Sequence, residues 1–122
     1  MEDLDKQKIE RIIRTRKKAH SWYSKKSKVY KSFVEMEQNT YKDGKLRKLQ
    51  KELVAIGISV VIDCEPCMEW HIKQALDNGA TEDEIIESVE VGIEMGGGPA
   101  TASARFAMNV LEYYRESKKL RK

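Results

Sequence analysis

Two residue types that carry chemistry, cysteine and histidine, occur together in the short stretch DCEPCMEWH, Asp63–His71. It contains both cysteines of the chain, Cys64 and Cys67, and one of its two histidines, His71. A C-x-x-C pair at the first turn of a helix brings two sulfurs within reach of a reversible disulfide. The free N–H groups of that turn stabilise a thiolate and so lower the pKa of the thiol. His71 follows Cys67 by one helical turn, where an imidazole can take the thiol proton directly or through a water molecule.

Two other interpretations of this stretch are open on spacing alone. C-x-x-C-x-x-x-H offers three zinc ligands, and His20 or a carboxylate would have to supply the fourth. Structural zinc sites usually have a second closely spaced pair of ligands, and the sequence shows no such pair. Alternatively, the cysteines are inert core residues and His71 is a histidine with an ordinary hydrogen-bond partner. Haem attachment is excluded because Met68, not a histidine, follows the second cysteine.

The segment before the cysteines decides the fold class. It has an apolar residue at every third or fourth position, which is typical of a helix: Leu46, Leu49, Leu53, Ile56 and Val60. Its β-branched run VAIGISVVI could also form a strand, and a strand followed by C-x-x-C and a helix would begin a thioredoxin-like site. A thioredoxin fold needs further strands after that helix, and no strand candidate follows residue 62. The sequence therefore predicts a helix over residues 45–62 and an all-α protein.

Capping signals divide the remainder into further helices. A sparse apolar stripe predicts a charged helix from Glu2 to about Lys18, and Ser21 or Ser24 is expected to cap the next one. We expect one domain over residues 1–122, built from five to six helices, with residues 1–20 as a charged helical extension.

The second half of the chain has clear helix boundaries. Asn78-Gly79 is typical of a helix C-terminus, and the TEDE sequence of Thr81–Glu84 is a capping box that starts the next helix. The glycines of Gly96–Gly98 interrupt that helix, and Pro99 suits the first turn of a final one.

Composition limits the classes of protein that this chain can represent. It is 40% hydrophobic and 35% charged, a balance that suits a small helical subunit whose core is completed by oligomerisation. No apolar run approaches the roughly 18 residues needed to span a bilayer, and the N-terminus lacks the apolar region of a secretory signal. We therefore expect a cytoplasmic location, where a cysteine pair is more often catalytic, redox-active or metal-binding than a structural disulfide.

Positive charge is concentrated in residues 11–31, around Trp22 and Tyr23, although the net charge is only +3. A nucleic-acid partner is conceivable for such a segment. It is not favoured, because no nucleic-acid-binding motif accompanies the charge. Solvated faces of two helices are the simpler interpretation.

About half of the chain resembles a known family. The segment from Asp43 to Ala100 is similar to the carboxymuconolactone decarboxylase / alkylhydroperoxidase D-like (AhpD-like) family. The matching features, in order and without gaps, are an acidic-Gly turn followed by Leu, the segment ELVAI, C-x-x-C-x-x-x-H, the pattern A-L-x-x-G-A-T-x-x-E-I-x-E, and Gly-Pro-Ala at the start of the last helix. The resemblance marks residues 43–100 as the motif-bearing core and implies an AhpD-like helical bundle that forms homotrimers or homohexamers.

The resemblance also implies a function. The redox members of the family pair their C-x-x-C and histidine with a glutamate twelve positions before the first cysteine, which here is Glu52. Glu52, His71, Cys67 and Cys64 are accordingly expected to form the catalytic site of a thiol-dependent peroxidase or disulfide reductase in antioxidant defence. In this scheme Cys67 attacks a hydroperoxide, Cys64 resolves the product to a disulfide, and an external dithiol or thioredoxin-like protein reduces it. No cofactor or metal is required.

Pro66 is a departure from the family pattern. The alkylhydroperoxidase that gave the family its second name has a histidine immediately before the second cysteine, where this chain has Pro66. A relay with one imidazole fewer is expected to weaken peroxidase turnover more than disulfide exchange. The alternatives are a non-redox, carboxymuconolactone decarboxylase-like enzyme on the same fold and a zinc-binding structural module. Because decarboxylase members typically lack the cysteine pair, its presence argues against lactone decarboxylation.

Overall fold

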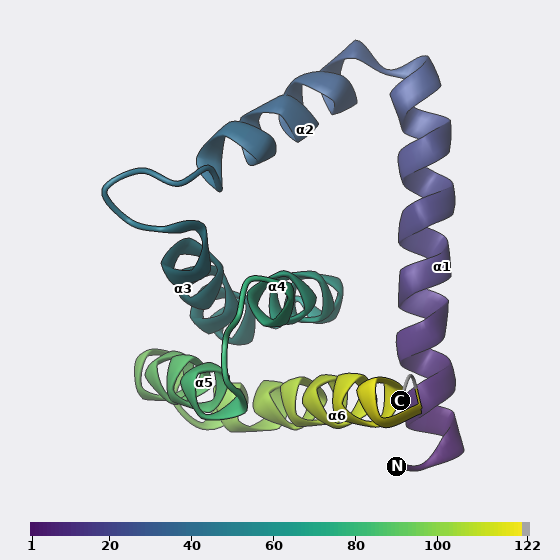
Figure 1. Ribbon diagram of the computed structural model, residues 1–122. Coiled ribbons are helices and arrows are strands. Elements are labelled where there is room, and N and C mark those ends of the chain that lie inside the picture. Colours follow the sequence, from purple (N-terminus) through teal and green to yellow (C-terminus); the bar gives the residue numbers. More distant parts are fainter. Residues whose placement is uncertain (121–122) are drawn as a thin grey trace.

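The computed structural model describes residues 1–120, which form six α-helices and no strand (Figure 1). The helices are α1 (Asp3–Lys26), α2 (Lys28–Thr40), α3 (Lys48–Val61), α4 (Glu65–Asp77), α5 (Glu82–Gly96) and α6 (Gly98–Leu120). The all-α fold and the helix number predicted from the sequence are thus confirmed. Within this range no helix is long and apolar enough to cross a membrane.

The boundary between the first two helices differs from the prediction. α1 does not end near Lys18 but continues to Lys26, and Ser27, rather than Ser21 or Ser24, caps α2. The Ser27 hydroxyl accepts a hydrogen bond from the backbone N–H of Tyr30 at 3.0 Å. No glycine or proline occurs before residue 44, so nothing in the sequence forces α1 to stop earlier. Serine is tolerated inside a helix, which makes a capping serine hard to single out from sequence.

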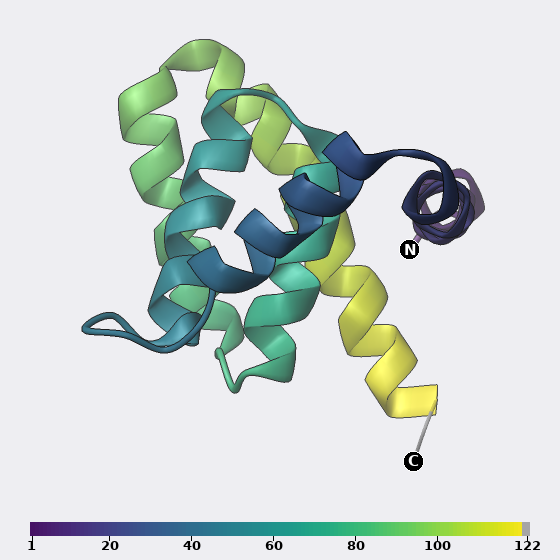
Figure 2. The same ribbon diagram turned by 90° about the horizontal axis from the view of Figure 1, so that it is seen from above.

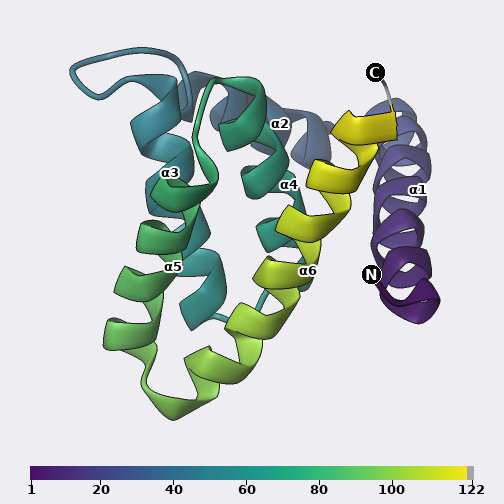
Figure 3. The same cartoon turned by 60° about the horizontal axis from the view of Figure 1, so that its bottom comes forward.

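Helices α3 to α6 form the core of the molecule. Figure 3 shows α3 beside α5 and α4 beside α6, and α3 also packs on α4. The largest fully buried apolar side chains of these helices are Ile56, Val60, Met68, Ile72, Ile85 and Val110. α3 and α5 approach very closely where Gly57 faces Gly92. A Cβ atom on Gly92 would lie only 2.7 Å from the Gly57 carbonyl oxygen, so no larger residue fits there without a shift of the helices. Both glycines therefore serve the close packing of the two helices.

A buried carboxylate attaches α1 to this core. Ile9 is fully buried, and about two turns further along α1 the Arg16 guanidinium pairs with Glu69 of α4, which is itself fully buried. The hydroxyl of Tyr114 on α6 donates a second hydrogen bond to Glu69. Arg16 also lies 4.8 Å from the ring centroid of Trp70. Glu69 is thus satisfied by groups from two other helices, and it links α1, α4 and α6.

Replacing Tyr114 with Phe should weaken this link. The variant loses a hydrogen bond to a buried, charged acceptor, which typically costs about 1.5–3 kcal/mol of unfolding free energy. Burial, followed by the hydrogen bond to Glu69, raises the pKa of Tyr114 above its usual 10.0. A raised folded-state pKa means that this stabilisation is complete below pH 10.0 and is lost as the pH rises through the folded-state value. Urea unfolding should therefore show a difference between wild type and Tyr114→Phe at pH 7 that shrinks above pH 10; equal stability at pH 7 would contradict this.

Helix α2 stands apart from the core. In Figures 1 and 2 it runs from the end of α1 across the α3–α4 side of the molecule, and within residues 1–120 its backbone closely approaches that of α1 alone. None of its residues is fully buried. Val29, Phe33 and Met36 occupy its outer face and are 81%, 56% and 56% exposed.

Candidate functional site

The turn between α3 and α4 places the cysteine pair. Asp63 has a φ of 54°, a left-handed conformation that aspartate tolerates better than most residues. Its carboxylate accepts a hydrogen bond from the Ser103 hydroxyl of α6 at 2.8 Å, and the Cys64 N–H donates to the Ser59 carbonyl of α3 at 3.0 Å. The turn is therefore fixed to both neighbouring helices, and α4 begins immediately after Cys64.

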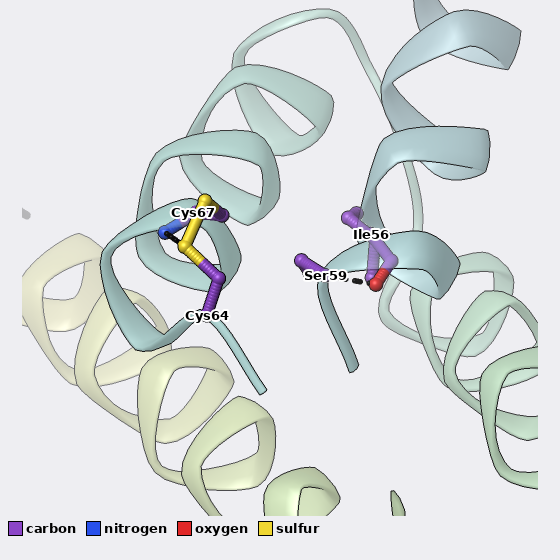
Figure 4. Close-up of a disulfide and its surroundings, with 4 residues drawn as sticks. All are labelled: Ile56, Ser59, Cys64 and Cys67. Atoms are coloured by element: carbon purple, nitrogen blue, oxygen red, sulfur yellow. Dashed lines mark hydrogen bonds between the residues drawn. A yellow bond between two sulfur atoms is a disulfide. The ribbon is translucent and has the colours of Figure 1, made fainter. Parts of the chain in front are cut away.

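Cys64 and Cys67 form a disulfide at the N-terminus of α4 (Figure 4). Cys64 is the N-cap residue, and its Sγ accepts a hydrogen bond from the backbone N–H of Cys67 at 3.3 Å. Glu65 and Pro66 occupy the first helical turn, which suits a proline because the first N–H groups of a helix need no partner within it. Neither sulfur-bearing residue is fully buried. Cys64 therefore lies at the N-terminal, positive end of the α4 helix dipole.

Glu52 and His71 lie side by side between α3 and α4. Oε1 of Glu52 is 2.6 Å from Nδ1 of His71, and the Glu52 side chain is 1% exposed. The geometry that satisfies both atoms has Nδ1–H of His71 donating to the carboxylate, which leaves Nε2 as the acceptor nitrogen. His71 follows Cys67 by one turn of α4, so the two side chains start from the same face of the helix. The sequence-predicted pairing of Glu52 with His71 is present in the structure.

Two residues that sequence reasoning did not single out complete the surroundings of Glu52. Lys48 Nζ donates to Oε2 of Glu52 at 2.9 Å, so both carboxylate oxygens are engaged. The Tyr41 ring lies 5.2 Å from the His71 ring, centroid to centroid. Burial, and then the charges of Glu52 and Glu37, raise the pKa of Tyr41 above its usual 10.0 and keep the phenol neutral. The i, i+4 spacing of Lys48 and Glu52 was a visible signal in the sequence, whereas nothing indicated Tyr41.

A hollow of about 300 Å³ gives solvent access to this end of the site. Tyr41, Lys48, Glu52 and Trp70 line it together with polar residues of α2 and α4. The hollow therefore lies on the side of Glu52 where Lys48 binds the carboxylate.

The other histidine is engaged elsewhere. Nδ1 of His20, on α1, is 3.0 Å from the Tyr30 hydroxyl of α2. In the part of the chain that the structure describes, no group of three or more histidine, cysteine, aspartate or glutamate side chains could hold a metal ion. The fourth ligand that the zinc interpretation asked of His20 therefore has no support from the geometry.

α1 also reaches the turn that carries the cysteines. Lys8 Nζ lies 2.8 Å from a carboxylate oxygen of Glu65, the residue directly after Cys64, and 5.2 Å from the centroid of the Phe106 ring. The pair is partly exposed and contributes little to stability, but it places the N-terminal helix next to the disulfide.

Comparison with known proteins assigns the family. The model of the carboxymuconolactone decarboxylase family matches residues 27–109. The chain belongs to this family. The resemblance deduced from the sequence is thereby confirmed, and the match extends it in both directions, to the whole of α2 and to the middle of α6.

Solved structures of the carboxymuconolactone decarboxylase family share the fold. One, from Thermotoga maritima, superposes with a TM-score of 0.83 at 28% identity, covering 89% of this chain and 93% of that one; a role in an antioxidative response has been suggested for it. A family protein from Legionella pneumophila gives a TM-score of 0.75 at 28% identity, covering 89% and 96% of the two chains.

Two sequence relatives are uncharacterised. A protein of the cox locus of Paracoccus denitrificans is 37% identical over 81 residues, 66% of this chain and 73% of that protein. A Cupriavidus necator protein is 39% identical over 72 residues, 59% of this chain and 61% of its own length. The carboxymuconolactone decarboxylase family includes enzymes and AhpD-like proteins.

Proposed function

We propose that this protein is a thiol-dependent peroxidase or disulfide reductase that cycles between a Cys64–Cys67 dithiol and disulfide. The observation that carries the proposal is the Glu52–His71 contact of 2.6 Å, one helical turn from Cys67. A buried carboxylate that orients an imidazole next to a thiol is the arrangement that activates cysteine nucleophiles. The antioxidative role suggested for the Thermotoga maritima relative agrees with it.

In the peroxidase reaction His71 takes the proton of the Cys67 thiol. The thiolate attacks the outer oxygen of a hydroperoxide, the O–O bond breaks, and the alcohol leaves with a proton while Cys67 becomes a sulfenic acid. The Cys64 thiol then attacks Cys67, the disulfide forms and water leaves. An external dithiol or thioredoxin-like protein reduces the disulfide, so that each cycle converts one hydroperoxide and one dithiol into alcohol, water and disulfide.

The two cysteines have different surroundings and hence different roles. His71 is positioned to deprotonate Cys67, whereas the N-terminus of α4 stabilises a thiolate on Cys64, whose Sγ accepts the Cys67 N–H. The Cys64 thiolate is therefore the better leaving group when a reducing partner attacks the disulfide at Cys67, and the better attacking group when the dithiol form meets the disulfide of a partner. With Pro66 between them in place of a histidine, we expect peroxidase turnover to be weakened more than disulfide exchange.

The proposed cellular compartment, cofactor requirement and assembly accompany this redox cycle. A dithiol cycle belongs in a reducing, cytoplasmic compartment, where a partner can return the disulfide to the dithiol form. No metal or organic cofactor takes part in the steps above. The whole chain acts as one catalytic domain, as a homotrimer or homohexamer.

The proposal is tested by consumption of an organic hydroperoxide with a small dithiol as reductant. The wild-type protein should consume peroxide in proportion to enzyme concentration and accumulate the disulfide when the dithiol is omitted. A protein with no activity in this assay and no ability to exchange disulfides with a reduced thioredoxin-like protein would rule the proposal out. Full activity of Cys64→Ser on a lactone carboxylate would favour the decarboxylase alternative instead.

Lys48→Met provides a graded check on the same site. The change removes the donor to Oε2 of Glu52 but leaves the contact between Glu52 and His71. We expect kcat/KM to fall by about tenfold or less, because Lys48 positions the carboxylate and does not touch the reacting groups. Lys51→Met, on the same helix and bonded to the carbonyls of Thr40 and Lys42, is the matched control and should keep its activity. Equal losses in both variants would contradict a specific role for Lys48.

A further inference from the structure

Positive charge is concentrated on α1 and at the start of α2. Residues 11–34 contain nine lysines and arginines and no aspartate or glutamate, in a chain whose net charge is +3, so the rest of the chain is net negative. Eight of the nine are exposed, and the ninth, Arg16, turns toward the core and pairs with Glu69. Within the part of the chain that the structure describes, none of the eight exposed cations has an acidic partner at ion-pair distance.

Helical spacing gathers four of these cations on one face of α1. They follow one another at intervals of three, four and seven residues: Arg11, Arg14, Lys18 and Lys25. Side chains at these intervals start from one narrow sector of a helix, and the fully buried Ile9 lies on the opposite side. Figure 1 shows α1 along one edge of the molecule, so this sector faces away from the core. At 1.5 Å per residue the row is about 21 Å long.

Trp22 places an exposed aromatic ring in this row. It lies between the last two cations, on the same face of α1, and is 53% exposed. Tyr23 makes a T-shaped contact with its ring at 4.8 Å between centroids, and Tyr23 in turn stacks on Tyr30 of α2 at 5.3 Å. Lys26 Nζ lies 5.2 Å from the centroid of the Trp22 ring. The four cations and Trp22 are called the α1 basic stripe below.

The residue types of the α1 basic stripe indicate its partner. A row of cations without acidic neighbours attracts a polyanion. An anionic membrane would require a broad apolar face beside the cations, whereas the isoleucines of α1, Ile9, Ile12 and Ile13, pack on the core. A single-stranded nucleic acid requires cations along its backbone and an aromatic side chain on which a base can stack. The stripe offers both, and in a duplex the bases would be stacked on one another instead.

We propose that the α1 basic stripe binds single-stranded nucleic acid without sequence preference, with phosphates along the four cations and one base stacked on Trp22. At 3.4 Å per nucleotide of a stacked strand, the row corresponds to about six nucleotides. From the sequence alone, solvated helix faces were the simpler interpretation; the structure adds the shared face and the exposed, supported ring. The inference is independent of the proposed redox function, because no residue of the stripe belongs to the disulfide site.

Fluorescence anisotropy of a labelled oligothymidylate of about 12 nucleotides tests the phosphate contacts. With four contacts, the logarithm of the association constant should fall with the logarithm of the salt concentration at a slope of about −3. Arg14→Gln/Lys18→Gln should halve this slope and weaken binding at about 50 mM salt by at least about tenfold. Lys42→Gln/Lys45→Gln removes the same charge from exposed lysines before α3 and is the matched control, which should bind like wild type. No binding at about 50 mM salt, or equal losses in both variants, would overturn the proposal.

Variants of Trp22 separate single strands from other polyanions. Trp22→Ala should weaken binding about 5- to 100-fold, and Trp22→Phe should retain most of the affinity, because stacking requires a ring. An unlabelled oligothymidylate should quench the tryptophan fluorescence of wild type but not that of Trp22→Phe, in which Trp70 remains. Circular dichroism will verify that the variants, all at exposed positions, keep the helical fold. If duplex DNA, polyglutamate or anionic lipid vesicles bind as tightly as the single strand, or if Trp22→Ala binds like wild type, the assignment to single strands is wrong.

Discussion

Glu52→Gln is expected to lower kcat/KM for hydroperoxide by about 10²–10⁴-fold, the range that positioned acid–base groups contribute. The glutamine amide can still hydrogen-bond to His71, but it can present an N–H instead of a carboxylate oxygen to Nδ1. The tautomer that leaves Nε2 free to accept the Cys67 proton is then no longer enforced. Peroxide consumption with saturating dithiol, measured across pH, gives the result directly.

Glu69→Gln is the matched control for this change. Glu69 is a second fully buried glutamate with one basic and one aromatic partner, Arg16 and Tyr114, but it does not contact His71. Its substitution should reduce stability while kcat/KM stays near wild type. If Glu69→Gln and Glu52→Gln lose activity equally, Glu52 acts through the fold and not through His71.

The second large effect is expected for the cysteines. Cys67→Ser should lose peroxidase activity completely, because no thiolate remains next to His71 to attack the O–O bond. Cys64→Ser should still react once with peroxide, and then stop at the sulfenic acid because the resolving thiol is missing. Stopped-flow measurement of a single turnover, followed by steady-state turnover, separates these two defects.

His71→Gln and His20→Gln distinguish the site histidine from the other one. His71→Gln should slow the single turnover to nearly the same extent as Glu52→Gln, since the two residues act as one unit. His20→Gln removes a contact between α1 and α2 at the Tyr30 hydroxyl and should leave the single turnover unchanged. A normal single turnover in His71→Gln would exclude the histidine as the base.

Much of this architecture could be predicted from the sequence because local signals coincide with the final structure. Both hydrogen bonds of the capping box predicted at Thr81 and Glu84 are present. The Glu84 N–H donates to the Thr81 hydroxyl at 3.1 Å, and the Thr81 N–H donates to the Glu84 carboxylate at 2.8 Å. Asn78 caps α4, and Gly79 adopts a positive φ of 96° as predicted for the end of a helix. The VAIGISVVI segment could have been a strand or a helix. Because no strand candidate follows residue 62, the sequence predicted a helix, and the segment indeed forms the second half of α3.

Other features depend on contacts between distant segments and left no local trace. In the sequence Glu69 cannot be distinguished from a surface glutamate. Its two partners, Arg16 and Tyr114, are 53 and 45 residues away in the chain and belong to other helices. Tyr41, at the C-terminal end of α2, lies next to His71 of α4 although 30 residues separate the two in the chain. Glu52 was found through the family resemblance, since a glutamate on an amphipathic helix is otherwise expected to face solvent.

The central claim is that Cys67 is a peroxide-reactive thiol resolved by Cys64. It is tested most directly by mass spectrometry of the reduced protein after one equivalent of hydroperoxide, in wild type and in each single Cys→Ser variant, with a sulfenic-acid trap present. We expect an intramolecular disulfide in wild type, a trapped sulfenic acid on Cys67 in Cys64→Ser, and no reaction in Cys67→Ser. A wild-type protein that stays fully reduced, with no trapped sulfenic acid in either variant, would contradict it.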